Sequence, residues 1–123
     1  MDDTVTREQL QKALRERHTQ EVQEKLDKAR VAVAGLGGLG SHVAAALARI
    51  GVGHLHLVDF DVVDITNLNR QQYTARHLGT CKTDALADAL REINPYLDIY
   101  TDRVNVTEDN LVSLFSGATI ICE

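Results

Sequence analysis

The chain has 123 residues, which is the length of one domain. Its hydrophobic content of 44% and charged content of 25% are ordinary for a globular protein, and no apolar run approaches the roughly 20 residues of a membrane-spanning helix. A net charge of −5 argues against general nucleic-acid binding, which needs a cationic surface. Since the charged N-terminus lacks the apolar core of a signal peptide, we expect a cytoplasmic protein that binds neither nucleic acid nor a membrane.

Residues 1–30 are predicted to form an N-terminal helical segment. The stretch from Thr6 to Gln9 matches a capping box that opens a helix. Apolar residues then recur at helical spacing, at Leu10, Leu14, Val22 and Leu26. His18 interrupts this register and Thr19 is able to cap a new start, so the segment is either one bent helix or two short ones.

The stretch 31–40, with the sequence V-A-V-A-G-L-G-G-L-G, is the most informative part of the chain. Its first four residues have the apolar pattern of a strand that is buried on both faces. Gly35, Gly37 and Gly40 then give the spacing G-x-G-x-x-G, with Gly38 as an extra glycine, and the alanine-rich residues 41–50 favour a helix. Strand, glycine turn and helix in this order are typical of a unit that binds the phosphates of a nucleotide.

A second apolar run, Leu55–Val58, ends at Asp59, which follows Gly40 by 19 residues. An acid at this distance is placed to accept hydrogen bonds from ribose hydroxyls. His54 and His56 alternate with leucines, so they share one face of this strand, and we expect satisfied or exposed histidines rather than metal ligands.

Residues 65–83 contain no acid but hold Arg70, Arg76 and Lys82. In an acidic chain this local excess of positive charge indicates either an anionic partner or a solvated loop. The cysteines, Cys81 and Cys122, form no C-x-x-C pair, so we expect two reduced structural cysteines and no metal site.

Four further elements complete the predicted fold. They are a helix over Thr80–Asn94, a strand over Leu97–Thr101, a short helix over Thr107–Phe115 and a strand over Thr119–Cys122. Alternating strands and helices predict an α/β domain over residues 31–123, with a Rossmann-like parallel sheet in the order 3-2-1-4 and helices on both faces. Glu123 lies where such a sheet places its next ligand-binding loop, so we expect the domain to be truncated there.

Several motifs together resemble those of the ThiF/MoeB superfamily, which includes the ubiquitin-activating enzymes. They are Q-E-K-L from Gln23, the run from Ala29 to Ser41, Asp59-Phe-Asp61, N-L-N-R-Q-Q-Y from Asn67, Lys82 and Ile93-Asn-Pro95. The form N-L-N-R-Q and the short helical N-terminus look most like the ThiF branch, which adenylates the sulfur carrier protein of thiamine biosynthesis.

The resemblance implies that the protein binds ATP and Mg²⁺ and adenylates the C-terminal carboxylate of a ubiquitin-like sulfur carrier protein, often as a homodimer. Arg70 and Lys82 become the candidate catalytic residues, and an arginine of the N-terminal helix, Arg15 or Arg17, is a candidate for reaching the phosphates. The metal-binding aspartate of the family is expected beyond Glu123. The implied nucleotide-binding set comprises Gly35, Gly37, Gly38, Gly40, Asp59, Asp61, Asn67, Asn69, Arg70, Gln71 and Lys82.

Two other classes of function remain open at the level of sequence. A dinucleotide-binding oxidoreductase domain needs only the stretch from Gly35 to Asp59, but it leaves residues 67–82 without a task. A non-catalytic module that binds a nucleotide or a regulatory partner is the other alternative.

Overall fold

The computed structural model describes residues 5–17 and 19–123, and these begin with two short helices, α1 (Arg7–Arg17) and α2 (Gln20–Lys28). The predicted capping box opens α1, where Gln9 N donates to Thr6 Oγ1 at 3.1 Å and Thr6 N donates to Gln9 Oε1 at 2.9 Å. Thr19 caps α2 by accepting from Val22 N at 3.2 Å. The alternative with two short helices is therefore the observed one, while His18 and residues 1–4 lie outside the described residues.

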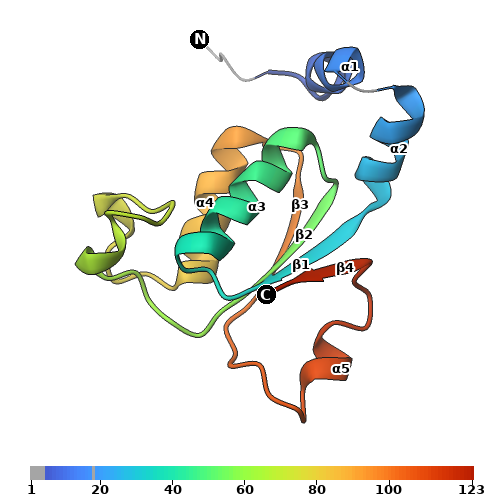
Figure 1. Cartoon of the computed structure of the whole chain (residues 1–123). Helices are drawn as coiled ribbons and strands as arrows, with labels where there is room; N and C mark the ends of the chain where they lie inside the picture. The colour runs from blue at the N-terminus through green and yellow to red at the C-terminus, as the bar shows by residue number, and fades with distance from the viewer. Residues whose placement is uncertain (1–4, 18) are drawn as a thin grey trace.

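Four parallel strands form the sheet, in the order β3-β2-β1-β4 (Figure 1). This confirms the predicted order 3-2-1-4. Since all four strands are parallel, their carboxyl ends meet at one edge of the sheet, which is the edge where ligands bind in folds of this kind. The strands are β1 (Arg30–Ala34), β2 (His54–Val58), β3 (Asp98–Asp102) and β4 (Ile120–Cys122).

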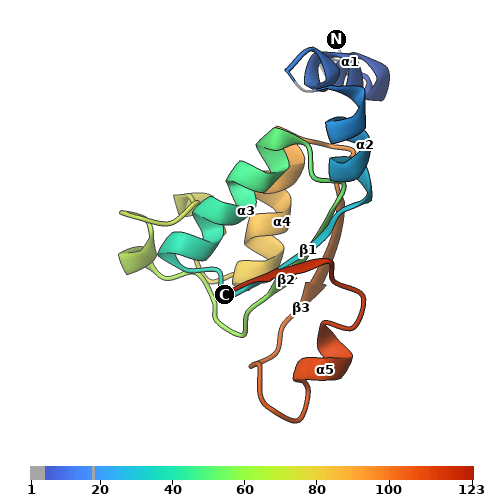
Figure 2. The same ribbon diagram turned by 45° about the vertical axis from the view of Figure 1, so that its right-hand side comes forward.

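Helices α3 (Gly38–Ile50) and α4 (Lys82–Ile93) cover one face of the sheet, and α5 (Leu111–Leu114) lies against the other (Figures 1 and 2). α3 begins inside the glycine run, three residues before the predicted start at Ser41. α5 is shorter than predicted, because residues 107–110 form a turn in which Asn110 Oδ1 accepts from Thr107 N at 2.8 Å.

The larger part of the core lies between the sheet and the helices α3 and α4. Its fully buried side chains include Leu55 and Leu57 of β2 and Leu86 and Leu90 of α4. Burying each such leucine contributes about 1.5–3 kcal/mol, so this layer holds the sheet and both helices in fixed positions. A smaller cluster of Ala32, Val58 and Phe115 packs α5 against the other face.

Between β2 and α4 the chain makes a long polar excursion that contains two short 3₁₀ turns, η1 (Ile65–Asn67) and η2 (Ala75–His77). In Figure 1 this excursion projects beyond the N-terminal ends of α3 and α4. No helix among residues 5–17 and 19–123 is long and apolar enough to cross a bilayer.

Candidate nucleotide site

The glycine turn that follows β1 brings helix α3 very close to the strand. Gly35 has a φ of +89°, a conformation that residues with a side chain rarely adopt, and its N–H donates to Val58 O at 2.9 Å. A Cβ placed on Gly40 would lie 1.8 Å from Gly35 O. Glycine is therefore required at both positions for steric reasons, and these two glycines fix where the helix begins.

Among the described residues, no side chain caps the first turn of α3, whose backbone N–H groups lie at the edge of the sheet. Its N-cap is Gly37, which has no side chain to accept from the amides of Gly38, Leu39 and Gly40. A helix of 13 residues concentrates a partial positive charge at this end. Free amides and this dipole together suit a phosphate group.

Asp59 joins the glycine turn to the end of β2. The residue is 8% exposed, and its carboxylate accepts from Leu36 N at 2.7 Å through Oδ2 and from Asp61 N at 2.8 Å through Oδ1. Each carboxylate oxygen has a second lone pair, so both retain capacity for a ligand hydroxyl. The sequence indicated a ribose contact here, and the structure adds that Asp59 anchors the turn.

A hollow of about 510 Å³ opens beside Asp59 at the carboxyl edge of the sheet. Gly35, Asp59 and Asp61 line it from the first two strands, and Val104 and Ile121 line it from the following segments. Its size lies in the range of small-molecule sites. This hollow brings together three residues of the predicted set.

Arg70 and Gln71 lie over the glycines from the opposite flank. A Cβ on Gly38 would be 3.8 Å from Cδ of Arg70, and one on Gly37 would be 3.8 Å from Nε2 of Gln71. Gln71 is 7% exposed and its Oε1 has no hydrogen-bond partner among the described residues. A buried polar atom without a partner is costly unless a ligand satisfies it, which fits a site that binds a polar molecule.

Polar contacts of the Arg70 side chain are confined to its own segment. Its Nη1 donates to Thr66 O at 3.1 Å and to Asn69 Oδ1 at 3.2 Å, and it pairs with no carboxylate among the described residues. Asn69 is exposed, whereas Asn67 is buried and its Oδ1 accepts from Asp64 N at 2.9 Å. Asn67 thus shapes the η1 turn, and Asn69 holds the guanidinium.

Residues 66–73, here called the Arg70 segment, are attached to α3 and the glycine turn by contacts that involve four further side chains. Tyr73 donates to Leu36 O at 2.6 Å, and Ser41 Oγ accepts from Gln72 N at 3.2 Å. His42 Nε2 bonds to Arg70 O at 2.7 Å, and Gln72 Nε2 bonds to His42 Nδ1 at 2.6 Å. Because a carbonyl only accepts, we assign the His42 proton to Nε2.

These four residues were not predicted to have a role in the site. Ser41 and Tyr73 stood within the motifs, but nothing in their spacing indicates contacts across 31 to 37 residues of chain. Burial raises the pKa of the Tyr73 hydroxyl, and the negative charge of Asp59 adds to the effect. Tyr73 therefore stays a protonated donor to the turn at neutral pH.

Lys82 is the first residue of α4 and is only 6% exposed. Its backbone N–H donates to Asp61 O at 2.9 Å, which places the start of α4 at the same edge of the sheet as the glycine turn. Its ammonium makes no ion pair with any carboxylate of residues 5–17 and 19–123. The Lys82 side chain is thus largely enclosed by the fold and carries a charge that no described carboxylate neutralises, which suits an anionic ligand.

The positive excess of residues 65–83 is partly neutralised inside the fold. Arg76 pairs with Asp88 at 2.5 Å and with Glu92 at 3.5 Å on α4. Arg76 is therefore a structural cation, and the charge available to an anion comes from Arg70 and Lys82.

Arg15 and Arg17 lie far from the glycine turn of their own chain. Both are exposed in the last turn of α1, and the neighbouring Leu14 packs at Gly51, the C-cap of α3. A helix of 13 residues is about 20 Å long, so these arginines are separated from the N-terminus of α3 by its full length. The described structure therefore does not bring these arginines to the glycine turn of their own chain.

No group of three His, Cys, Asp or Glu side chains within the described part of the chain is arranged to hold a metal ion. Cys81 and Cys122 are free thiols. His54 bonds to Asp98 at 2.9 Å and His56 to Asp102 at 2.6 Å, so both histidines are satisfied, as the sequence predicted. The described residues therefore hold no three-ligand metal site, and a Mg²⁺ ion there would need phosphate oxygens of a nucleotide as further ligands.

Known proteins and solved structures match most of this chain. The molybdopterin-synthase adenylyltransferase of Salmonella typhimurium is 40% identical over 104 residues, which are 84% of this chain and 42% of that protein. The tRNA N6-threonylcarbamoyladenosine dehydratase TcdA of Escherichia coli, solved with AMP, covers 98% of this chain and 50% of its own at 30% identity and a TM-score of 0.87. MccB of Escherichia coli, solved with AMPCPP and MccA, covers 81% of this chain and 30% of its own at 32% identity and a TM-score of 0.76.

These relatives are longer proteins, since the chain spans less than half of the Salmonella enzyme and half of TcdA. The TcdA structure has also been solved with ATP, again with a TM-score of 0.87. A sequence model of the ThiF family matches residues 8–123, nearly the whole chain. The fold, the glycine turn and these matches together show that the chain belongs to the ThiF family.

Proposed function

We propose that the chain is the nucleotide-binding part of an ATP-dependent adenylyltransferase that activates the C-terminal carboxylate of a ubiquitin-like sulfur carrier protein. The observation that carries this proposal is the uncapped N-terminus of α3 with the Arg70 side chain lying over Gly38. This arrangement supplies amide donors and a guanidinium to the same small volume. Both groups favour a phosphate chain.

In the proposed reaction an oxygen of the carrier carboxylate attacks the α-phosphorus of ATP. The bond from that phosphorus to the bridging oxygen of pyrophosphate breaks, and an acyl adenylate and pyrophosphate form. Arg70, Lys82 and the amides of the glycine turn stabilise the charge that grows on the departing pyrophosphate. No general base is needed, because the carboxylate is already ionised at neutral pH.

ATP is favoured over NAD as the nucleotide. Arg70 and Lys82 carry charge without an acidic partner in the described structure, which suits a triphosphate better than the single pyrophosphate of NAD. The matched structures that contain AMP, ATP and AMPCPP support the same choice.

Finer parts of the proposal rest on the family resemblance. They are the carrier of thiamine biosynthesis as partner, a homodimer that brings Arg15 or Arg17 of a second copy to the phosphates, and a Mg²⁺-binding aspartate beyond Glu123. A cytoplasmic location, and the division into a helical segment 1–30 and a nucleotide-binding part 31–123, also remain predictions.

A second candidate is the dehydration of threonylcarbamoyladenosine in tRNA, the activity for which TcdA is named. It is favoured by the match to TcdA over 98% of this chain, compared with 81% for MccB. A net charge of −5 opposes it, since tRNA binding needs a cationic surface.

Pyrophosphate exchange into ATP by the whole protein separates these functions. We expect exchange that depends on a sulfur carrier protein with a free C-terminal carboxylate, and none when NAD replaces ATP. Exchange that requires modified tRNA would favour the second candidate. Tight NAD binding without Mg-ATP binding would contradict both.

A further inference from the structure

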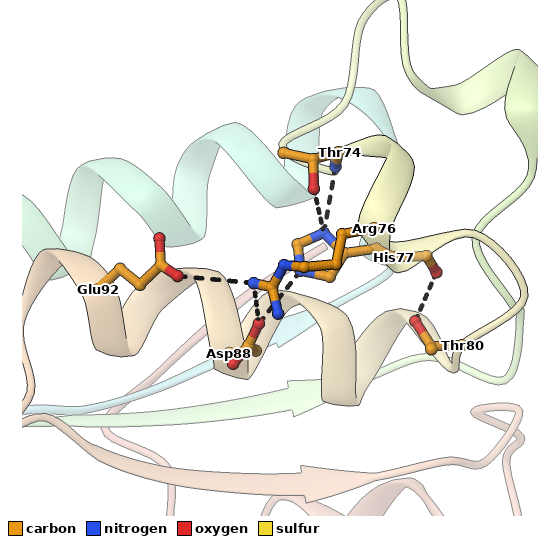
Figure 3. Close-up of polar contacts among 6 residues, drawn as sticks. All are labelled: Thr74, Arg76, His77, Thr80, Asp88 and Glu92. Atoms are coloured by element: carbon orange, nitrogen blue, oxygen red, sulfur yellow. Dashed lines mark hydrogen bonds and ion pairs between the residues drawn. The ribbon is translucent and has the colours of Figure 1, made fainter.

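Outside the candidate site, one acidic side chain of α4 holds the turn η2 by two contacts. Asp88 Oδ2 accepts from Arg76 Nη2 at 2.5 Å and from His77 Nε2 at 3.3 Å (Figure 3). Glu92, one turn further along α4, reaches only Arg76, at 3.5 Å. Donation from Arg76 and then from His77 holds the pKa of the Asp88 carboxyl below its ordinary value, so this residue is ionised at neutral pH.

The hydrogen bonds of His77 determine which ring nitrogen bears the proton. Thr74 N donates to Nδ1 at 3.1 Å, so Nδ1 is an acceptor and the proton lies on Nε2, which faces Asp88. The histidine is 5% exposed, and its carbonyl accepts from Thr80 Oγ1 at 2.6 Å. The Asp88 carboxylate thus holds His77, and hydrogen bonds from Thr74 N and Thr80 Oγ1 to His77 close the turn on either side of it (Figure 3).

Both ends of this turn lead directly into the candidate site. Thr74 follows Tyr73, whose ring packs edge-on against His77 at 6.3 Å and whose hydroxyl donates to Leu36 O in the glycine turn. At the other end, Thr80 O accepts from Val63 N at 2.8 Å, two residues before Lys82 opens α4. Asp88 therefore lies where the Arg70 segment and the Lys82 helix are joined.

We propose that Asp88 is a positioning residue for the nucleotide site, which acts through His77 and Arg76 to hold the Arg70 segment in register with α4. The inference rests on the proposed function. Among the described residues, Asp88 bonds to none of the predicted nucleotide-binding set, so its effect passes through the turn. Loss of its charge releases His77 and lets Tyr73 and Arg70 shift relative to the glycines.

The matched pair Asp88→Asn and Glu92→Gln tests this in the whole protein. Each substitution removes one negative charge from the exposed side of α4 near Arg76, but only the first replaces the charged acceptor of His77 Nε2 by a neutral, weaker one. Mg-ATP affinity is measured by calorimetry, and exchange of the amides of residues 70–80 is followed by mass spectrometry. We expect Asp88→Asn to weaken Mg-ATP binding about tenfold or more and to speed exchange across this segment.

Glu92→Gln is expected to stay within about twofold of the unmodified chain in both measurements. Asp88→Glu keeps the charge and should restore most of the affinity, which a general loss of stability would not do. If Asp88→Asn does not fold, Arg76→Gln removes the shorter of the two contacts, and it should weaken Mg-ATP binding while Glu92→Gln does not.

Equal Mg-ATP affinity for Asp88→Asn and the unmodified chain would overturn the inference, and so would an equal loss in Glu92→Gln. These outcomes leave the proposed function standing, because the unmodified chain still binds Mg-ATP. Failure of the whole, unmodified protein to bind Mg-ATP would instead overturn the proposed function, and the positioning role with it.

Discussion

Arg70 and Tyr73 lie three residues apart on one segment and have different tasks. The Arg70 side chain is exposed and lies over Gly38 with contacts only to its own segment. Tyr73 is 5% exposed and donates into the glycine turn. We propose that the first residue acts on a ligand, whereas the second holds the turn in place, so their substitutions should affect different measurements.

Arg70→Ala is expected to reduce adenylation by the whole protein a hundredfold or more, about 3 kcal/mol of barrier, because a cation that meets growing charge is removed. The melting temperature should change little, since surface substitutions alter stability by about 0.5 kcal/mol or less. Arg91→Ala, at an exposed position of α4, is the control and should leave both unchanged. A large loss of stability with normal turnover per folded molecule would contradict a catalytic role for Arg70.

Tyr73→Phe is expected to lower the free energy of unfolding by about 1–3 kcal/mol at pH 7, because Leu36 O loses its buried donor. The pKa of Tyr73 is raised in the folded state, so its stabilising effect is complete below the unfolded value of about 10 and is lost as pH rises above it. The gap between the two proteins should therefore narrow above pH 10 in denaturant titrations. A gap that widens there would show that Tyr73 ionises readily in the folded protein.

At the scale of elements, the close crossing of α3 over the glycine turn decides the shape of the candidate site. Gly40 leaves no room for a side chain, whereas a Cβ on Gly38 would meet only Arg70 atoms at 3.8 Å, an ordinary contact. Glycine at these two positions of one helical turn therefore has different physical causes. Gly40 is required for packing, whereas for Gly38 we propose a role in keeping the amides of the turn open to a ligand.

Gly40→Ala is expected to destabilise the fold by several kcal/mol or prevent folding, because α3 has to move away from Gly35 O. Gly38→Ala should keep or slightly raise the melting temperature, by the helix propensity of alanine, while it weakens nucleotide binding. Thermal unfolding and Mg-ATP calorimetry of both variants check this. A Gly40→Ala protein of unchanged stability would mean that the crossing distance relaxes freely.

Across the whole molecule, the central strands are enclosed and the edges are open. β1 pairs with β2 and β4, and β2 also pairs with β3, so two strands are hydrogen-bonded on both sides. Ala32 and Leu57 are fully buried, whereas Ile120 and Ile121 of β4 are about half exposed, at 56% and 48%. The two edge strands, β3 and β4, are consequently less protected than β1 and β2.

Amide hydrogen exchange should be slower in the central strands than in the edge strand β4 and in α5. We expect amides of β1 and β2 to exchange only on global unfolding, and those of β4 and α5 to exchange through local openings. Mass spectrometry of the native chain over a time course gives the ranking directly. Equal protection of β2 and β4 would contradict it, and the result applies whether or not the chain binds a nucleotide.

The element order, the parallel sheet and the glycine turn were all predictable from the sequence. A buried strand has a continuous apolar pattern, and helices between such strands require parallel pairing with right-handed crossovers. The glycine spacing carries its own steric reason, which Gly35 and Gly40 bear out. Local rules of this kind depend only on neighbouring residues, so they are readable without a structure.

Tertiary structure decided which polar residues meet. The sequence grouped Arg70, Arg76 and Lys82 as one positive stretch, but the fold pairs Arg76 with Asp88 and leaves the other two without a carboxylate among the described residues. The fold also joins Tyr73 to the glycine turn, and His42 and Ser41 of α3 to the backbone of Arg70 and Gln72. Such contacts depend on how the excursion between β2 and α4 folds back onto α3, a geometry set by packing across long stretches of chain and not by the order of residues within it.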